Sequence, residues 1–313
     1  TYLTLARHRL NVTIRGGVTA QRIIFEGKTA VGIEAESGGE VFTVYGDQII
    51  VSSGAVASPQ LLMLSGVGPA AHLAEMGIGL VHDMPGVGQN LRDHPAAFVL
   101  LKGIGDPPDE DAPNIQLGLR FSNPGSPTRA DFQLSPILMS SEHRPSSVQI
   151  DNDDFHFGLS VALQNATSAG QLRLTSTDPR VQPDLNYDYL SDPDDRARMR
   201  EALRLALSIA EHPSFSGMVV ERLNPTDEDL ASDDALDNWM LRNAYTQHHT
   251  SGTCKMGDAS DPMAVVDQYS HVHGMQNLRV VDASVMPDVI RANTNATTLM
   301  IAERVSDWIK EGK

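Results

Sequence analysis

Two polar segments near the end of the 313-residue chain carry the side chains best suited to chemistry. The first covers residues 247–257 and contains His249, followed by glycines that let the backbone approach a ligand closely. The second covers residues 280–298 and contains Asn293, shortly before a helix predicted over about 297–310. An imidazole can take a proton from a hydroxyl near neutral pH, and an amide can hold a substrate oxygen. Together these residues predict an acid–base site.

Each of these side chains also has a purely structural interpretation. His249 could be an ordinary loop histidine, and Asn293 could simply cap the following helix. The functional interpretation of Asn293 uses the same physics, because the free N–H groups at a helix start stabilise developing negative charge. Asp282 closes an apolar strand over residues 278–281, where it could bind a cofactor hydroxyl or only form a turn. It is the combination of these residues that favours a functional site.

A metal site is a weaker interpretation of the same region. His248 and His249 are adjacent, so they cannot easily point at one ion, and His271 and His273 have no carboxylate at a helical spacing. The single cysteine, Cys254, excludes an intrachain disulfide and a cysteine-based zinc site. We therefore expect no metal.

Composition narrows the class of protein. The formal charge is −16, from 24 Lys and Arg against 40 Asp and Glu, and such an acidic surface repels nucleic-acid phosphates and anionic lipids. No apolar run reaches the roughly 18–20 residues that a membrane span needs. One cysteine is compatible with a reducing compartment, and we expect a cytoplasmic protein. Hydrophobic residues make up 41% of the chain, as in ordinary globular proteins, and the length favours two domains.

The elements that must position the site begin with short strands over residues 11 to about 53. Residues 11–15 are rich in β-formers, residues 31–36 alternate, and residues 48–51 form a continuous apolar strand. The last strand leads into Gly54 and Ala55, and then into a predicted helix with Ser58 as N-cap, Pro59 in its first position and Gly66 beyond its end. Such a unit commonly binds a phosphate or ring edge, and it also occurs as plain α/β connectivity.

The middle of the chain, from about residue 96, predicts a largely antiparallel sheet with long loops. Strand-like pieces at 131–134 and 155–161 alternate with connectors rich in Pro, Gly and Asp, at 105–113, 123–127 and 140–154. Asp192 and Pro193 predict a helix start, with an apolar face at Met199, Leu203, Ala206 and Ala210.

A capping box at Thr226 and Asp229 predicts a second helix, carrying Leu236 and Trp239. In the final helix we expect Ile301, Val305 and Trp308 to be buried.

Several of these segments resemble the glucose–methanol–choline family of flavin-dependent oxidoreductases. Residues 54–68, which start Gly-Ala-Val-Ala-Ser-Pro-Gln-Leu-Leu, and residues 85–94, Pro-Gly-Val-Gly-Gln-Asn-Leu-Arg-Asp-His, are similar to two signature segments of that family. Residues 172–193 resemble the sheet of its substrate domain, and the two C-terminal segments resemble its active-site loops. The likeness covers essentially the whole chain and is poorest from about 104 to 155.

This resemblance implies an α/β (α+β) fold, with part of an FAD-binding Rossmann-like domain and a substrate domain on a mainly antiparallel sheet. It divides the chain into 1–95 in the FAD-binding domain, 96–240 in the substrate domain, and 241–313 carrying the active-site loops back to the FAD-binding domain. His249 would be the catalytic base and Asn293 its partner on the substrate oxygen. The residues expected to lie against FAD are Val18, Gly54, Ala55, Asp282, Ala283, Asn293 and Thr294.

The implied reaction is oxidation of a small alcohol to an aldehyde or ketone, with hydride transfer to flavin N5. Some family members instead cleave cyanohydrins without redox chemistry, so a lyase remains an alternative. Choline itself is not favoured, since aromatics are only 5% of the chain and none can be assigned to a cage for its ammonium group.

The chain departs from the family in one respect. The family's strand–Gly-x-Gly-x-x-Gly–helix unit, which binds the pyrophosphate, has no counterpart here, because Gly86-x-Gly88 is not followed by a third glycine or a helix. We therefore expect a C-terminal portion that acts with an N-terminal companion chain or segment. Alone it could be inactive, and a non-catalytic half-subunit is a further alternative.

Overall fold

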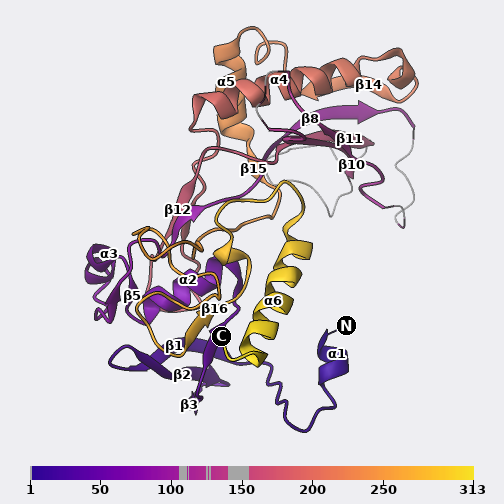
Figure 1. Ribbon diagram of the computed structural model, residues 1–313. Helices are drawn as coiled ribbons and strands as arrows, with labels where there is room; N and C mark the ends of the chain where they lie inside the picture. The colour runs from indigo at the N-terminus through magenta and orange to yellow at the C-terminus, as the bar shows by residue number, and fades with distance from the viewer. Residues whose placement is uncertain (1, 106–110, 112, 125, 127, 140–154) are drawn as a thin grey trace.

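The computed structural model describes residues 2–105, 111, 113–124, 126, 128–139 and 155–313. Figure 1 shows two regions, one containing α2 and α6 with the small sheets, the other a larger sheet covered by α4 and α5. The fold is therefore mixed α/β with mainly antiparallel sheets, as predicted. The predicted connector 140–154 and parts of 105–113 and 123–127 lie outside the described residues.

The N-terminal part forms a three-stranded antiparallel sheet after a short helix, α1 (Tyr2–Ala6). Its strands are β1 (Thr19–Glu26), β2 (Thr29–Ser37) and β3 (Glu40–Tyr45). The strand predicted at residues 11–15 is absent, and the expectation was wrong. Most of these residues are exposed, so their β-forming side chains have no surface on which to pack.

The predicted turn at Gly54 lies between a strand of a parallel pair and a helix. β4 (Ile49–Val51) pairs with β16 (Leu278–Val280), and α2 (Gly54–Leu64) follows β4 directly. Ser58 is therefore not the N-cap, because the helix already begins at Gly54 and Ser53 occupies the N-cap position, without a side-chain cap bond. The predicted stop is confirmed, since Gly66 adopts φ +83° just past the C-cap.

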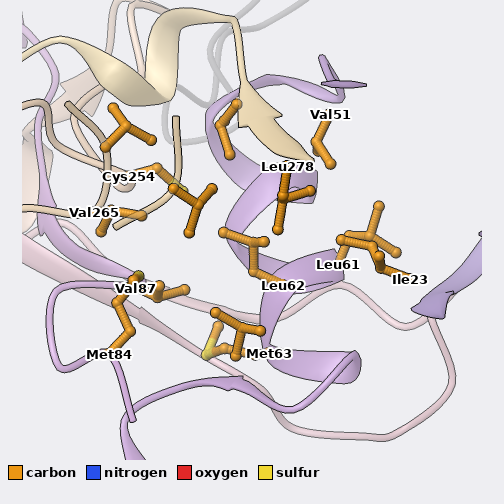
Figure 2. Close-up of a cluster of buried hydrophobic side chains, with 14 of the residues drawn as sticks. Ile23, Val51, Leu61, Leu62, Met63, Met84, Val87, Cys254, Val265 and Leu278 are labelled. Carbon is orange, nitrogen blue, oxygen red and sulfur yellow. The ribbon is translucent and has the colours of Figure 1, made fainter. Parts of the chain in front are cut away.

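Smaller elements surround α2 and complete this region. They are β5 (Val67–Gly68), α3 (Ala70–Glu75), β6 (His82–Asp83), β7 (Gln89–Leu91), β12 (Gly170–Arg173) and β13 (Asp184–Asn186). Figure 2 shows their shared core, in which Leu62 and Met63 of α2 pack with Cys254, Val265 and Leu278 from the C-terminal segments. Chain segments about 200 residues apart are thus held together by apolar burial.

The second region is a six-stranded antiparallel sheet of order β14-β8-β11-β10-β9, with β15 also paired to β8. Its strands are β8 (Pro95–Gly103), β9 (Leu119–Phe121), β10 (Phe132–Met139), β11 (His156–Leu163), β14 (Val219–Asn224) and β15 (Tyr245–Thr246). Alternate side chains of β8, such as Val99 and Leu101, pack in one core with α4 and α5. Phe98 and Leu100 form a separate cluster with Tyr245.

Of the two helices over this sheet, the first begins where it was predicted and the second begins later. α4 (Pro193–Ala210) has Asp192 as N-cap, and its four predicted apolar positions are buried. A short 3₁₀ turn, η1 (Pro213–Phe215), follows. α5 (Asp233–Asn243) begins later than predicted, with Ser232 as N-cap. Thr226 and Asp229 do form the reciprocal capping-box bonds, but these close only a turn.

The last helix, α6 (Thr294–Lys310), begins three residues earlier than predicted, directly after Asn293. Of its three expected core positions only Val305 is buried, while Ile301 and Trp308 are partly exposed. Over the described part of the chain, no helix has the length and apolar character required to cross a bilayer.

Candidate functional site

His249 lies in a loop that leaves the edge of the large sheet at β15. The preceding residue, His248, has φ +61° and is exposed, while His249 is half-buried. This left-handed turn sends the two adjacent imidazoles to different environments. The loop then runs antiparallel to residue 92, since Arg92 and Ser251 exchange two backbone hydrogen bonds of 2.9 Å. At Gly252 an added Cβ would lie 2.6 Å from the Asn90 carbonyl, so this close approach requires glycine.

Asp93 holds this loop in place from the β7–β8 connection. Its carboxylate is 4% exposed and accepts hydrogen bonds from the backbone N–H groups of His94 (2.7 Å) and His249 (3.0 Å). The hydroxyls of Tyr189 (2.6 Å) and Thr246 also donate to it. Four donors thus satisfy a buried charge, which makes Asp93 the fixed point to which the His249 backbone is attached.

Three polar side chains line up at the centre of the site. Nδ1 of fully buried His94 lies 2.8 Å from Nδ1 of His249. On the other side of His249, Nε2 lies 3.1 Å from the amide nitrogen Nδ2 of Asn293. Nε2 of His94 lies 2.8 Å from the backbone carbonyl oxygen of Ile290. The row therefore starts and ends in the same short segment before α6.

Asn293 occupies the N-cap position of α6 without forming a side-chain cap bond. A cap residue usually accepts a hydrogen bond from the first turn of its helix. Here the Asn293 side chain is exposed and is directed to His249 instead. As a result, the N–H groups in the first turn of α6 receive no bond from the Asn293 side chain. The Asn293 amide lies next to the His249 imidazole instead.

Burial keeps both imidazoles of the row neutral near pH 7. Loss of solvation lowers the pKa of His94 to about 4. The hydrogen bond to the Ile290 carbonyl opposes this shift, and the nearby His249 adds to it, both to a smaller extent. Burial also lowers the pKa of His249, while the Asp93 carboxylate partly offsets this effect. A neutral imidazole has one bare ring nitrogen, which is the form that can accept a proton.

A second group of predicted residues meets at the carboxyl ends of β4 and β16. The Asp282 carboxylate is 6% exposed and accepts hydrogen bonds from Gly54 N (3.0 Å), Ser58 Oγ (2.5 Å) and Ser284 N (2.8 Å). It caps the 3₁₀ turn η2 (Ala283–Val285). These bonds are those of a turn-forming Asp, and they leave only one of the carboxylate's four lone-pair positions free.

The two groups of residues are joined through α2 and the histidine loop. Pro59 has no N–H, so the carbonyl of Ala55 cannot receive the usual bond from the residue four positions later. Thr253 Oγ1 donates to this carbonyl instead, at 2.6 Å. The backbone N–H of Gly252 also donates to Ala283 O, at 3.2 Å. An interruption within α2 thus provides the attachment point for the loop that carries His249.

Comparisons with known proteins show which family the chain belongs to. Models of the GMC oxidoreductase family match residues 1–96 with the N-terminal domain and residues 166–302 with the C-terminal domain. The chain belongs to the GMC oxidoreductase family. Curated relatives include the oxygen-dependent choline dehydrogenases of Photobacterium profundum (33% identical, covering 98% of this chain and 58% of the relative) and Pseudomonas aeruginosa (36%, 99% and 59%).

Solved structures of pyridoxine 4-oxidase and formate oxidase show the same fold as this chain. Pyridoxine 4-oxidase from Mesorbium loti superposes with a TM-score of 0.89 at 28% identity, over 98% of this chain and 60% of that one. Formate oxidase from Aspergillus oryzae gives 0.84 at 25% identity, over 98% and 62%. The chain thus spans about three fifths of the length of these relatives and solved proteins.

The structure brings together some of the residues predicted from the GMC resemblance. His249 meets Asn293, while Gly54 and Ala55 lie with Asp282 and Ala283. Thr294 opens α6 beside Asn293. Val18 comes immediately before β1 and is half-buried. The roles of all these residues toward substrate or FAD remain predictions.

Asp93 and His94 were missed, although they end the segment 85–94 that resembles a GMC signature. In the structure Asp93 binds the backbone of His249 and His94 contacts its ring. The resemblance of this segment to a GMC signature was the signal for a functional role, but it does not indicate a contact with His249. Among the described residues, no group of three or more His, Cys, Asp or Glu side chains could bind a metal.

Proposed function

We propose that this GMC chain takes part in the FAD-dependent oxidation of an alcohol to an aldehyde or ketone. The observation that carries the proposal is the 3.1 Å approach of His249 Nε2 and Asn293 Nδ2, at the open N-terminus of α6. A base and a neutral donor side by side provide both groups that an alcohol needs for activation.

The chain's own residues would act on the hydroxyl. An alcohol that enters between the two side chains can donate its proton to Nε2 of His249 and accept a hydrogen bond from Asn293. As His249 takes the proton, negative charge develops on the substrate oxygen, and the Asn293 amide stabilises it. Bound FAD would accept the hydride that leaves the carbon bearing this hydroxyl.

The cofactor-side residues fit such a flavin. Gly54 has φ +86°, and a Cβ built on it would contact nothing within 4 Å, so there is open space next to the carboxyl ends of β4 and β16. Ligands of open parallel sheets bind at these ends. The uncapped first turn of α6, a 17-residue helix, suits the negative charge that a flavin ring gains on reduction.

The substrate side favours a neutral, partly apolar alcohol over choline. Phe98 and Tyr245 stack with ring centroids 4.6 Å apart, and the Tyr245 hydroxyl lies 2.6 Å from Ser160 Oγ. Asp93, whose carboxylate binds the hydroxyl of Thr246 next to Tyr245, already accepts four hydrogen bonds. Because the two rings stack on each other, one face of each ring is not available for a cation–π contact with an ammonium group.

Anaerobic addition of alcohol to the flavin-loaded, full-length protein tests the reaction. We expect bleaching of the oxidised flavin absorbance, faster with benzyl alcohol than with choline at equal concentration. A cyanohydrin-cleaving enzyme would release aldehyde and cyanide with no bleaching, and an inactive protein would show neither. Absence of bleaching with both classes of alcohol would refute the proposal.

Two further expectations remain predictions. A companion chain or segment that binds the FAD phosphates is checked by native mass spectrometry of the flavin-loaded protein. A cytoplasmic location is checked by fractionation of the native cell.

A further inference from the structure

We propose that His94 is a positioning residue that fixes the tautomer of His249, so that Nδ1 of His249 carries the proton and Nε2 is the free base facing Asn293. The catalytic consequence rests on the proposed alcohol oxidation. The tautomer itself is a property of the folded chain and can be measured without substrate.

The first step of the argument is the protonation of His94. A carbonyl oxygen can only accept, so at 2.8 Å from Ile290 O the Nε2 atom of His94 must carry a hydrogen. His94 is completely buried, which disfavours a second proton on the ring. Nδ1 of His94 is therefore bare and can act only as an acceptor.

The second step transfers this constraint to His249. The two Nδ1 atoms lie 2.8 Å apart, a distance that requires one hydrogen between them. His94 does not supply it, so Nδ1 of His249 does. Nε2 of a neutral His249 is then bare, and it faces Nδ2 of Asn293, which is a donor, at 3.1 Å. All four groups from the Ile290 carbonyl to the Asn293 amide are satisfied by this one arrangement.

No other described group around His249 makes the same bond. Both Asp93 oxygens accept from other donors, and Asp93 reaches His249 only through the backbone N–H. His248 turns outward and is exposed. Without His94, the His249 ring would be free to carry its hydrogen on Nε2, which would place a donor where the base is needed.

Substitutions at position 94 can separate hydrogen bonding from space filling. In His94→Asn, the side-chain oxygen can occupy the place of Nδ1, which retains the acceptor but loses the donor to Ile290. In His94→Gln, the side-chain nitrogen can occupy the place of Nε2, which retains that donor but loses the acceptor. Gln is closer to His in volume, so a purely packing role favours Gln, whereas the proposed role favours Asn.

The experiment measures ring ¹⁵N chemical shifts and two-bond ¹H–¹⁵N couplings of ¹⁵N-histidine-labelled, flavin-loaded protein at pH 7.5, with His249 assigned through His249→Gln. We expect the Nδ1–H tautomer of His249 in the wild type and in His94→Asn, and the Nε2–H or a mixed tautomer in His94→Gln. Nε2–H in the wild type would overturn the proposal by itself, whether or not the variants fold.

The kinetic counterpart is the limiting rate of anaerobic flavin reduction. We expect His94→Gln to lower this rate by about 10–10²-fold, part of the contribution of a positioned base, with substrate affinity nearly unchanged. His94→Asn should recover most of the loss, provided that near-UV circular dichroism shows both variants folded. Equal rates for the two variants, or a slower Asn variant, would contradict the assigned role. Because the NMR result needs no turnover, failure of the alcohol reaction is distinguishable from failure of the tautomer assignment.

Discussion

Asp282 and Asn293 occupy equivalent local positions and are used in opposite ways. Each is the N-cap residue of a helical element, Asp282 of η2 and Asn293 of α6. Asp282 is buried and binds three donors of its own chain, including Ser58 on α2. Asn293 is exposed, makes no cap bond, and directs its amide to His249. A polar side chain released from its local structural bond is available for chemistry, whereas a fully bonded one supports the scaffold.

The largest expected effect comes from removing His249, the residue to which Asn293 directs its amide. His249→Ala should lower the limiting rate of flavin reduction by about 10²–10⁴-fold, because the alcohol would lose its base. Anaerobic stopped-flow spectroscopy of the full-length, flavin-loaded protein measures this rate. His248→Ala is the matched control, since the adjacent ring is exposed, and it should react within about twofold of wild type. Comparable rates for both variants would remove His249 from its role.

Asn293→Ala should lower the same rate by about 10²-fold, as the loss of one donor to a developing oxyanion does. Asn293→Asp is the sharper variant, because it retains shape but replaces the donor with a negative charge next to the substrate oxygen. Stopped-flow measurement of both variants should rank wild type above Ala and Ala above Asp. An Asp variant as fast as wild type would show that the Asn293 amide does not act as a donor.

Asp282→Ala should instead reduce the free energy of unfolding, by about 3 kcal/mol, because it leaves buried donors without their charged acceptor. Urea titration followed by circular dichroism measures the change. In the same assay Asn293→Ala should change stability by less than about 0.5 kcal/mol, since no cap bond is lost. Ser232→Ala, which removes a real cap bond to Ala235 N, should cost about 1 kcal/mol. Equal losses at Asp282 and Asn293 would abolish the contrast between the two caps.

The smallest effect concerns pH and the buried end of the row that includes Asn293. His94 has a folded-state pKa of about 4, below its ordinary value of 6.5, so the unfolded chain binds more protons between these values. Stability should therefore fall as the pH drops through this window, by about 2 kcal/mol from pH 7 to pH 5 on account of this group.

Urea titrations at several pH values check this dependence. His94→Asn has no titrating ring at this position, so its stability should fall less steeply over the same pH range. An identical dependence of stability on pH in the wild type and the variant would show that the pKa of His94 is not lowered in the folded protein.

Much of the arrangement could be predicted from local sequence. The Asp192–Pro193 helix start and the Gly66 stop depend on neighbouring residues, and the structure confirms both. The α2 start was misplaced because Ser58 and Pro59 satisfy local capping rules, whereas the carboxylate of Asp282, 224 residues away, determines what the Ser58 hydroxyl binds. Local preference is weak compared with such a buried charged bond.

The contact between His94 and His249 was beyond sequence reasoning for a related reason. His94 and His249 are 155 residues apart, and only the packing of the sheet edge against the C-terminal loop brings them together. Nothing in the segment 85–94 distinguishes a histidine that faces another histidine from one at a loop end. Tertiary contacts, which a single sequence does not display, decide that question.

The segment from Ile290 to Asn293 has a consequence for how this protein can vary. It provides the oxygen that binds His94 and, three positions later, the amide that faces His249. A deletion or insertion between these two positions would misplace one end of the row relative to the other, even if every side chain were retained. Loop length there is therefore as restrictive as residue identity, and sequence changes in this segment should be substitutions at Arg291 and Ala292, both exposed, rather than changes in length.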